Sequence, residues 1–219
     1  MKKKAVSIQI SKTLGSVSGE CIIPAKSKCI MALAHGAGAG MNHIFMTSLS
    51  DSLAEFGIAT LRFNFVFSEH GKGRPDSPEV AHQCIASAIA KAGKLFPSLP
   101  VFASGKSFGG RMTSQYMATP ERSDIVSGIA FYGFPLHQPG KPATDRAAHL
   151  KDVNVPMLFL QGTRDELASF KLIESVCASL PTATLVEIEG ANHMFKAGKL
   201  DTMSLLTAAT NNWIDEVLD

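Results

Sequence analysis

The most informative stretch of the sequence reads Gly105-Lys106-Ser107-Phe108-Gly109. It fits the pattern G-x-S-x-G, in which the serine stands on a tight turn between a strand and a helix. Such a turn leaves no space for bulky side chains two positions before or after the serine, which explains the two glycines. Because so short a pattern also arises by chance, the residues around it have to supply the strand and the helix.

The flanking residues provide that setting. Residues 99–104 are a short apolar run typical of a buried strand, and residues 108–118 have the pattern of a helix. Strands and helices alternate along the whole chain, which indicates an α/β fold with a central, mostly parallel sheet and helices on both faces. The expected strands are 7–10 and 19–23, which form an opening hairpin, and 29–34, 59–63, 99–104, 126–132, 156–160 and 183–188; the expected helices begin near 42, 77, 108 and 203.

Length and composition agree with this fold. The 219 residues predict one α/β domain, residues 1–219, and contain no repeat or linker that would divide it. Hydrophobic residues make up 45% and charged residues 18%, as expected for strands that are buried on both faces. A net charge of +2 is too small to predict nucleic acid or an anionic membrane as a partner. The sequence carries no signal for an oligomeric state.

The N-terminus and the cysteines bear on location. Residues 1–4 are basic like the start of a signal peptide, but residues 5–12 are too short and too polar to continue one. No apolar run approaches the ~18 residues that span a bilayer. The cysteines fit neither a zinc site nor a disulfide framework and are expected to be buried thiols: Cys21, Cys29, Cys84 and Cys177. We therefore expect a cytoplasmic protein.

Two further residues complete a catalytic arrangement around Ser107. A serine hydroxyl needs an adjacent base, and His193 follows the last expected strand. The base needs an orienting carboxylate, and Asp165 follows the strand before it, with Glu166 and Asp152 as nearby alternatives. Because the carboxyl ends of parallel strands meet at one edge of a sheet, we expect these side chains to converge.

An oxyanion site should lie beside the serine. One donor is expected to be the backbone N–H of Phe108, directly after the nucleophile. The other is expected from the glycine-rich loop that begins at His35, where small residues let amides approach a substrate oxygen. We favour Ala37 for this role and keep Gly38 as the alternative. His35 itself is expected to hold the loop in place.

Substrate-binding residues are harder to assign. His43 lines the pocket or simply begins a helix at the surface. Arg74 and Arg111 bind an acidic substrate or pair with carboxylates such as Asp76. The segment 133–155 is too short for a large lid, so an open site with minimal or no cap is expected.

Nucleotide-binding readings of the glycines fail on spacing. A phosphate-binding loop ending at Ser107 would need glycine where Pro100 stands. A dinucleotide fingerprint that begins at Gly36 or Gly38 would place its third glycine at Met41 or His43. We therefore expect no nucleotide cofactor, and the proposed chemistry needs no metal.

The chain resembles the α/β-hydrolase superfamily, and within it the small capless branch of dienelactone-hydrolase-like proteins and KANL/Tex-type hydrolases. The similar stretches span nearly the whole chain: HGAGAGMNH (35–43), TLRFNF (60–65), GKSFGGRM (105–112), YGFPLHQPGKP (132–142), QGTRD (161–165) and GANH (190–193). The resemblance implies an α/β-hydrolase fold with Ser107 as nucleophile, Asp165 as acid and His193 as base. Dienelactone hydrolases proper use cysteine as the nucleophile, so Ser107 argues against dienelactone turnover.

The sequence thus predicts a serine hydrolase of the carboxylesterase or thioesterase kind, acting on small ester or thioester substrates through an acyl-enzyme. The alternative is a non-catalytic interaction protein that has kept the fold, because fold alone does not determine function. Loss of a triad member or of the small residues around Ser107 would mark that alternative, and neither loss is seen.

Overall fold

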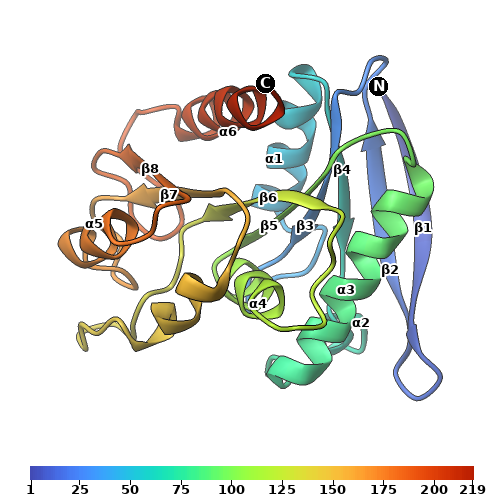
Figure 1. The fold of residues 1–219 in the computed structure, drawn as a ribbon, viewed down its shortest axis with the longest axis horizontal. Helices are drawn as coiled ribbons and strands as arrows, with labels where there is room; N and C mark the ends of the chain where they lie inside the picture. Colours follow the sequence, from blue (N-terminus) through green and yellow to red (C-terminus); the bar gives the residue numbers. More distant parts are fainter.

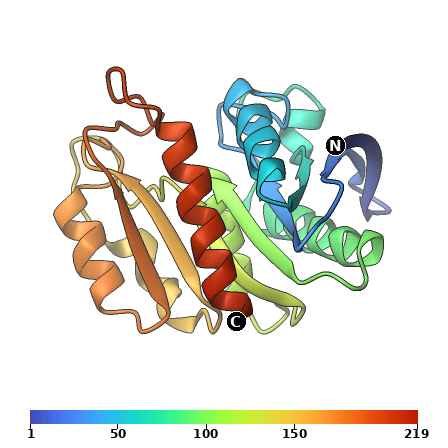
Figure 2. The same cartoon turned by 90° about the horizontal axis from the view of Figure 1, so that it is seen from above.

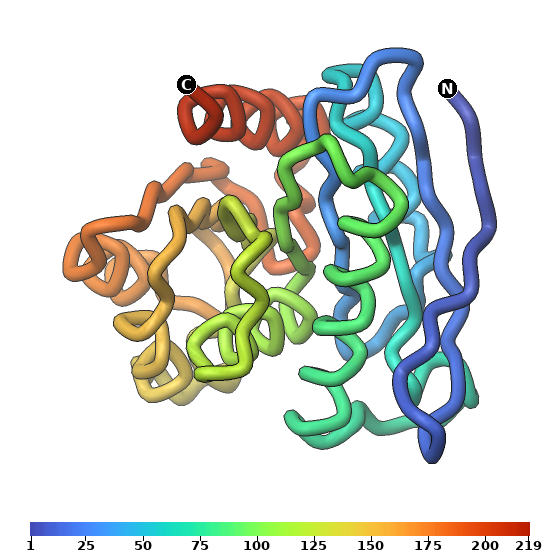
Figure 3. Tube along the Cα trace, turned by 45° about the vertical axis from the view of Figure 1, so that its right-hand side comes forward, coloured from blue at the N-terminus to red at the C-terminus, as the bar shows by residue number.

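The computed structural model describes all residues 1–219. Its centre is an eight-stranded sheet with the strand order β1-β2-β4-β3-β5-β6-β7-β8 (Figure 1). The strands are β1 (Lys2–Ser11), β2 (Gly15–Ile23), β3 (Cys29–Ala34), β4 (Ile58–Phe63), β5 (Val101–Lys106), β6 (Val126–Tyr132), β7 (Met157–Gly162) and β8 (Ala183–Ile188). The β1-β2 hairpin lies at one edge of the sheet and β8 at the other (Figure 3).

Six neighbouring strands, β4-β3-β5-β6-β7-β8, run parallel, and only β1 and β2 are antiparallel to their neighbours. Parallel strands need crossover connections, and these return each chain segment to the same end of the sheet. The loops after β3, β5, β7 and β8 therefore share one edge, at the carboxyl ends of the strands, where ligands bind in open α/β sheets.

Helices cover both faces of the sheet (Figure 2). One apolar cluster joins the sheet to α1 and α6, and a larger one joins the opposite face to α3, α4 and α5. Residues on the central strands are apolar on both faces and almost wholly buried, as the composition predicted. The helices are α1 (Ile44–Glu55), α2 (Val66–Glu69), α3 (Pro78–Leu95), α4 (Phe108–Met117), α5 (Phe170–Ala178) and α6 (Thr202–Leu218), with a 3-10 helix, η1 (Asp145–Asp152).

The predicted architecture is confirmed: a mostly parallel sheet with helices on both faces and no cap over the carboxyl edge. The helix expected to begin near residue 42 is α1, which begins at Ile44; His43 caps it and accepts a hydrogen bond from the N–H of Phe45. The helices α2, α5 and η1 were not predicted, because each is too short to show a clear helical period.

The four cysteines are buried and unpaired, as expected. Burial raises the thiol pKa of each, to about 11 or 12. A thiol held neutral in this way is a weak nucleophile, so these side chains act as small apolar core residues.

None of the helices combines the length and apolar character needed to cross a bilayer.

Candidate active site

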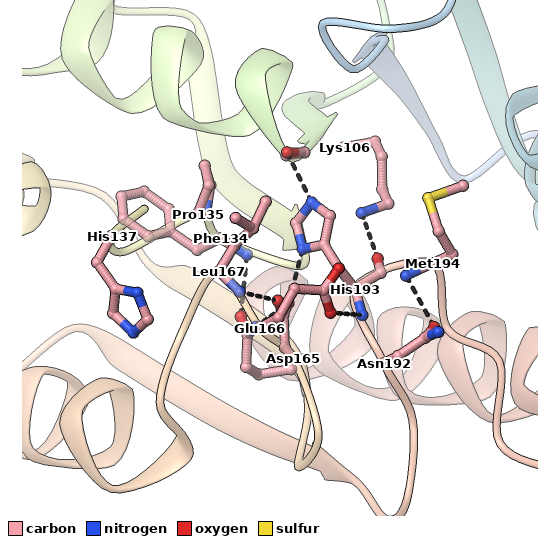
Figure 4. Close-up of polar contacts among 12 residues, drawn as sticks. Lys106, Phe134, Pro135, His137, Asp165, Glu166, Leu167, Asn192, His193 and Met194 are labelled. Carbon is pink, nitrogen blue, oxygen red and sulfur yellow. Dashed lines mark hydrogen bonds and ion pairs between the residues drawn. The ribbon is translucent and has the colours of Figure 1, made fainter. Parts of the chain in front are cut away.

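Three loops at the carboxyl edge bring Ser107, Asp165 and His193 into one hydrogen-bonded chain. Ser107 follows β5, Asp165 lies in the loop after β7, and His193 lies in the loop after β8. The imidazole Nε2 is 2.8 Å from Ser107 Oγ, and Nδ1 is 2.8 Å from a carboxylate oxygen of Asp165 (Figure 4). Because a carboxylate only accepts, Nδ1 carries the proton and Nε2 is free to accept from the serine hydroxyl.

Ser107 stands on a strained turn. Its φ is 51° and its ψ is −115°, a left-handed backbone that non-glycine residues rarely adopt. A Cβ at Gly105 would lie 2.4 Å from backbone atoms of Gly109 and Gly110, and one at Gly109 would lie 2.6 Å from the carbonyl oxygens of Ala34 and His35. The two glycines therefore allow the close strand-helix packing that holds Ser107 on this turn.

Asp165 is itself fixed by hydrogen bonds. The carboxylate accepts from the side-chain amide of Gln161 at 2.6 Å and from the N–H of Leu167 at 2.8 Å. The Gln161 carbonyl oxygen in turn accepts from the N–H of Phe134 at 2.9 Å, which fixes the amide orientation. Gln161 was not predicted as a site residue, although it begins the QGTRD stretch; its position four residues before Asp165 was the available signal.

The two alternative carboxylates do not take the place of Asp165. Glu166 is exposed, and its carboxylate lies 3.5 Å from the backbone N of His193 rather than beside the imidazole. Asp152 ends η1 and is exposed, with its charge near His149. Of the three carboxylates, only that of Asp165 contacts the ring of His193.

Lys106 is a site residue that the sequence did not single out. Its side chain is buried, lines the cleft beside Ser107 and donates a hydrogen bond of 2.7 Å to the carbonyl oxygen of His193 (Figure 4). Burial lowers the pKa of the Lys106 ammonium to about 8, while the nearby carboxylates of Asp165 and Glu166 oppose that change. Its place inside G-x-S-x-G was the one available signal.

A cleft of about 220 Å³ opens over Ser107 and His193. The glycine loop 36–39 forms one side of it, and Lys106, Ser107 and His193 also line it, whereas Asp165 lies behind His193 and does not. The remaining wall is mostly apolar and consists of Phe45, Met46, Leu167 and Met194, together with His43. The lining combines a hydroxyl and an imidazole with an apolar surface, which is the composition of a small-molecule site.

The three backbone N–H groups expected to hold an oxyanion are free. Those of Ala37, Gly38 and Phe108 donate to no other group of the chain, and Ala37 and Gly38 line the cleft. The Phe108 ring turns away from the cleft and packs at 5.3 Å against the ring of Phe65. Unpaired amides beside a serine hydroxyl are suited to bind a developing negative charge.

His35 holds the glycine loop, as expected. Its Nδ1 lies 2.8 Å from the carbonyl oxygen of Gly36, and its Nε2 accepts from the N–H of Phe65 at 3.1 Å. The ring is fully buried, and burial lowers its pKa to about 4. Both ring nitrogens are therefore occupied by backbone groups.

The remaining expected pocket residues divide into two groups. His43 lines the cleft and also caps α1, so both readings of it hold at once. Arg74 and Arg111 are absent from the lining, because Arg74 is exposed and Arg111 begins α4 near Arg146. Neither arginine forms an ion pair with Asp76, whose carboxylate accepts from the N–H of Phe67 instead.

Comparison with known proteins defines the class. Residues 27–217 match the family described as "Alpha/beta hydrolase domain", so the chain belongs to the α/β-hydrolase family.

No group of three or more histidine, cysteine, aspartate or glutamate side chains is arranged to hold a metal ion.

Several solved structures share the fold along nearly the whole chain. A serine hydrolase homologue from Coxiella burnetii has a TM-score of 0.78 at 20% identity, covering 95% of this chain and 98% of that one. A dienelactone hydrolase from Anabaena variabilis has a TM-score of 0.77 at 20% identity, covering 98% and 97%. A serine hydrolase without a lid from Xanthomonas campestris has a TM-score of 0.77 at 19% identity, covering 97% and 95%.

Proposed function

We propose that the protein is a serine hydrolase that cleaves carboxylic ester or thioester bonds of small substrates through an acyl-enzyme. The observation that carries this proposal is the chain of hydrogen bonds from Ser107 through His193 to Asp165. It lies in a cleft on a strained turn, in a chain of the α/β-hydrolase family. The whole chain, residues 1–219, acts as one catalytic domain.

In the proposed reaction each group has a role that its contacts support. Nε2 of His193 takes the hydroxyl proton as Ser107 Oγ attacks the acyl carbon, and then gives that proton to the leaving alcohol or thiol. Asp165 holds the Nδ1–H tautomer and stabilises the imidazolium. Water activated by the neutral His193 then attacks the acyl-serine, which releases the acid and restores Ser107.

The free amides complete the reaction site. The N–H of Phe108 and that of Ala37, with Gly38 as the alternative, bind the oxyanion of the tetrahedral intermediate. Removing one such donor costs about 10²–10³ in kcat in other serine enzymes. The cleft of about 220 Å³ and its apolar wall of Phe45, Met46 and Met194 favour a small, uncharged acyl group.

A fluorophosphonate probe tests the proposal directly, because it phosphonylates only an activated serine. We expect the wild-type protein to be labelled and Ser107→Ala to remain unlabelled. Ser104→Ala is the matched control, because Ser104 is buried on β5 and its hydroxyl donates to the carbonyl oxygen of Ala32. An unlabelled, folded wild type would favour the non-catalytic interaction protein.

A panel of p-nitrophenyl esters and acyl thioesters of increasing chain length then defines the substrate. We expect the highest kcat/KM for short, uncharged acyl groups that the cleft can hold. Rates that rise steadily to long chains, or a preference for acidic acyl groups, would contradict the small apolar pocket.

A further inference from the structure

Lys106 is a buried cation that acyl transfer as described above does not use. The residue is only 6% exposed, although it directly precedes the proposed nucleophile. Taking an ammonium group out of water is costly, so buried lysines are rare unless a specific interaction compensates. No carboxylate lies within ion-pair distance of its Nζ. The compensation has to come from other contacts.

Those contacts converge on the loop that carries His193. The Lys106 ammonium donates to the carbonyl oxygen of His193 itself, at 2.7 Å (Figure 4). It also lies 5.3 Å from the ring centre of Phe195 and 5.9 Å from that of Phe45, within the range of cation–π attraction. The rings of Phe195 and Phe45 stack on each other at 5.9 Å. Phe195 lies on the loop that carries His193, and Phe45 lies on α1.

The loop needs such support. Phe195 has a φ of 58°, a left-handed conformation that a bulky residue adopts only where its surroundings hold it. Within the loop, the Asn192 side chain accepts from the N–H groups of Met194 and Lys196. These bonds shape the loop but do not fix its distance from Ser107, which lies on a different strand connection.

We propose that Lys106 is a positioning residue whose ammonium holds the His193 loop at the distance from Ser107 that proton transfer requires. The inference rests on the proposed function. Lys106 and Ser107 are joined by a peptide bond, Ser107 Oγ is 2.8 Å from Nε2 of His193, and the His193 carbonyl returns to Lys106 Nζ. Nucleophile and base are thereby closed into one ring of covalent and hydrogen bonds.

Space for the ammonium is kept open by Gly133, at the end of β6. A Cβ there would lie 3.1 Å from Lys106 Nζ and 3.6 Å from both Asp165 and His193, and the φ of Gly133 is +72°. Any other residue would be strained and would crowd the Lys106 ammonium, while its Cβ made ordinary contact with Asp165 and His193. The structure thus accommodates Lys106 and the catalytic groups as one unit.

The positive charge of Lys106 strengthens its contacts to the His193 loop. The titratable groups around it are Asp165 and Glu166 from the loop after β7, His193 from the loop after β8, and His43 at the start of α1. A charged donor forms a stronger hydrogen bond than a neutral one, and only the cation attracts the ring faces. Since the pKa of Lys106 is about 8, the hold should weaken above that pH.

Lys106→Met tests the proposal, because methionine fills similar space without a donor or a charge. We expect kcat and the rate of fluorophosphonate labelling to fall about 100-fold, as for a displacement of about 1 Å in a catalytic group. KM should change much less than kcat, because the other residues that line the cleft remain. Lys199→Met is the matched control, since Lys199 is exposed on the same connection to α6 and should leave both rates unchanged.

The pH profile separates positioning from mere structural support. Wild-type kcat should decline with a midpoint near pH 8, and this decline should be absent from Lys106→Met. Lys106→Gln restores a neutral donor, so it should be faster than Lys106→Met and equally insensitive to alkali. If Lys106→Met does not fold, the same measurements on Lys106→Gln decide the question.

The outcomes are distinguishable from failure of the proposed function. A wild type that does not react with the probe contradicts the hydrolase proposal. A reactive wild type whose folded Lys106 variants react equally fast, or retain the alkaline decline, overturns the role of Lys106 alone.

Discussion

His35 and His193 lie in loops at the same edge of the sheet, after β3 and β8, and they differ in what their ring nitrogens contact. Both are buried, with 0% and 7% exposure. Both loops are rich in small residues, and both line or border the cleft. Burial and location at this edge therefore do not by themselves separate a structural histidine from the proposed base.

The contacts do separate them. His35 bonds only to backbone groups, the carbonyl oxygen of Gly36 and the N–H of Phe65, neither of which exchanges protons at neutral pH. Its burial also lowers its pKa to about 4, which makes it a poor proton acceptor. The ring is a fixed link between the glycine loop and the segment after β4.

His193 bonds to two side chains instead. Nδ1 faces the Asp165 carboxylate, which stabilises the protonated ring, and Nε2 faces a hydroxyl that can give up its proton. A histidine can transfer protons when one nitrogen meets an ionised partner and the other meets a reactive group. The same type of side chain is thus bound to backbone groups in the loop after β3 and to reactive side chains in the loop after β8, which supports the proposed role of His193.

The largest expected effect separates the two histidines by activity. His193→Gln should lower kcat/KM by about 10⁴–10⁶, because losing the base leaves only binding and oxyanion stabilisation. The free energy of unfolding should change by no more than about 1 kcal/mol, since the ring borders the cleft. Steady-state kinetics and urea denaturation check both numbers. An active His193→Gln would mean that another group acts as the base.

Asp165→Asn should lower kcat/KM nearly as much as His193→Gln. An amide at this position can donate to Nδ1, which favours the wrong imidazole tautomer, and the corresponding change lowers kcat by about 10⁴ in serine proteases. Glu166→Gln is the matched control, because this exposed carboxylate lies one residue away and does not contact the ring. A rate that falls in Glu166→Gln but not in Asp165→Asn would reverse the assignment.

Much of this arrangement could be predicted from the sequence. The elbow at Ser107 follows from local sterics, and the placing of Asp165 and His193 follows from the rule that parallel strands end at one edge. Both inferences need only the order of elements along the chain. The fold was predicted correctly because the order of strands and helices can be read from local sequence patterns.

The features that the sequence did not reveal needed three-dimensional detail. The bond from Lys106 to His193 joins residues 87 apart, on strands that β6 and β7 separate in the sheet. Nothing in the spacing reveals it. The direction of a long side chain on a loop or helix start is equally hidden, so Arg74 and Arg111 were considered for a cleft that they do not line.

A smaller effect concerns stability in acid. Burial lowers the pKa of His35 from 6.5 to about 4, so the unfolded state binds more protons than the folded state between these values. Stability therefore falls as the pH falls through this window, and His35 alone should contribute about 3 kcal/mol of that loss between pH 6.5 and pH 4. Urea denaturation at several pH values measures it.

His149 complicates that measurement, because burial also lowers its pKa to about 4. We therefore expect His35→Gln and His149→Gln each to reduce the acid sensitivity, and the double variant to reduce it further. An unchanged slope in His35→Gln would mean that His35 is not held neutral by its surroundings.

The smallest effect completes the contrast between the histidines. At pH 7.5 His35→Gln should lower the free energy of unfolding by about 1–3 kcal/mol, because it leaves the buried N–H of Phe65 or the carbonyl of Gly36 without its partner. Activity should persist at temperatures where the variant is folded, reduced about tenfold at most by looser oxyanion amides. A stable but inactive His35→Gln would show that His35 takes part in the chemistry, and the distinction between backbone-bound and side-chain-bound histidines would then fail.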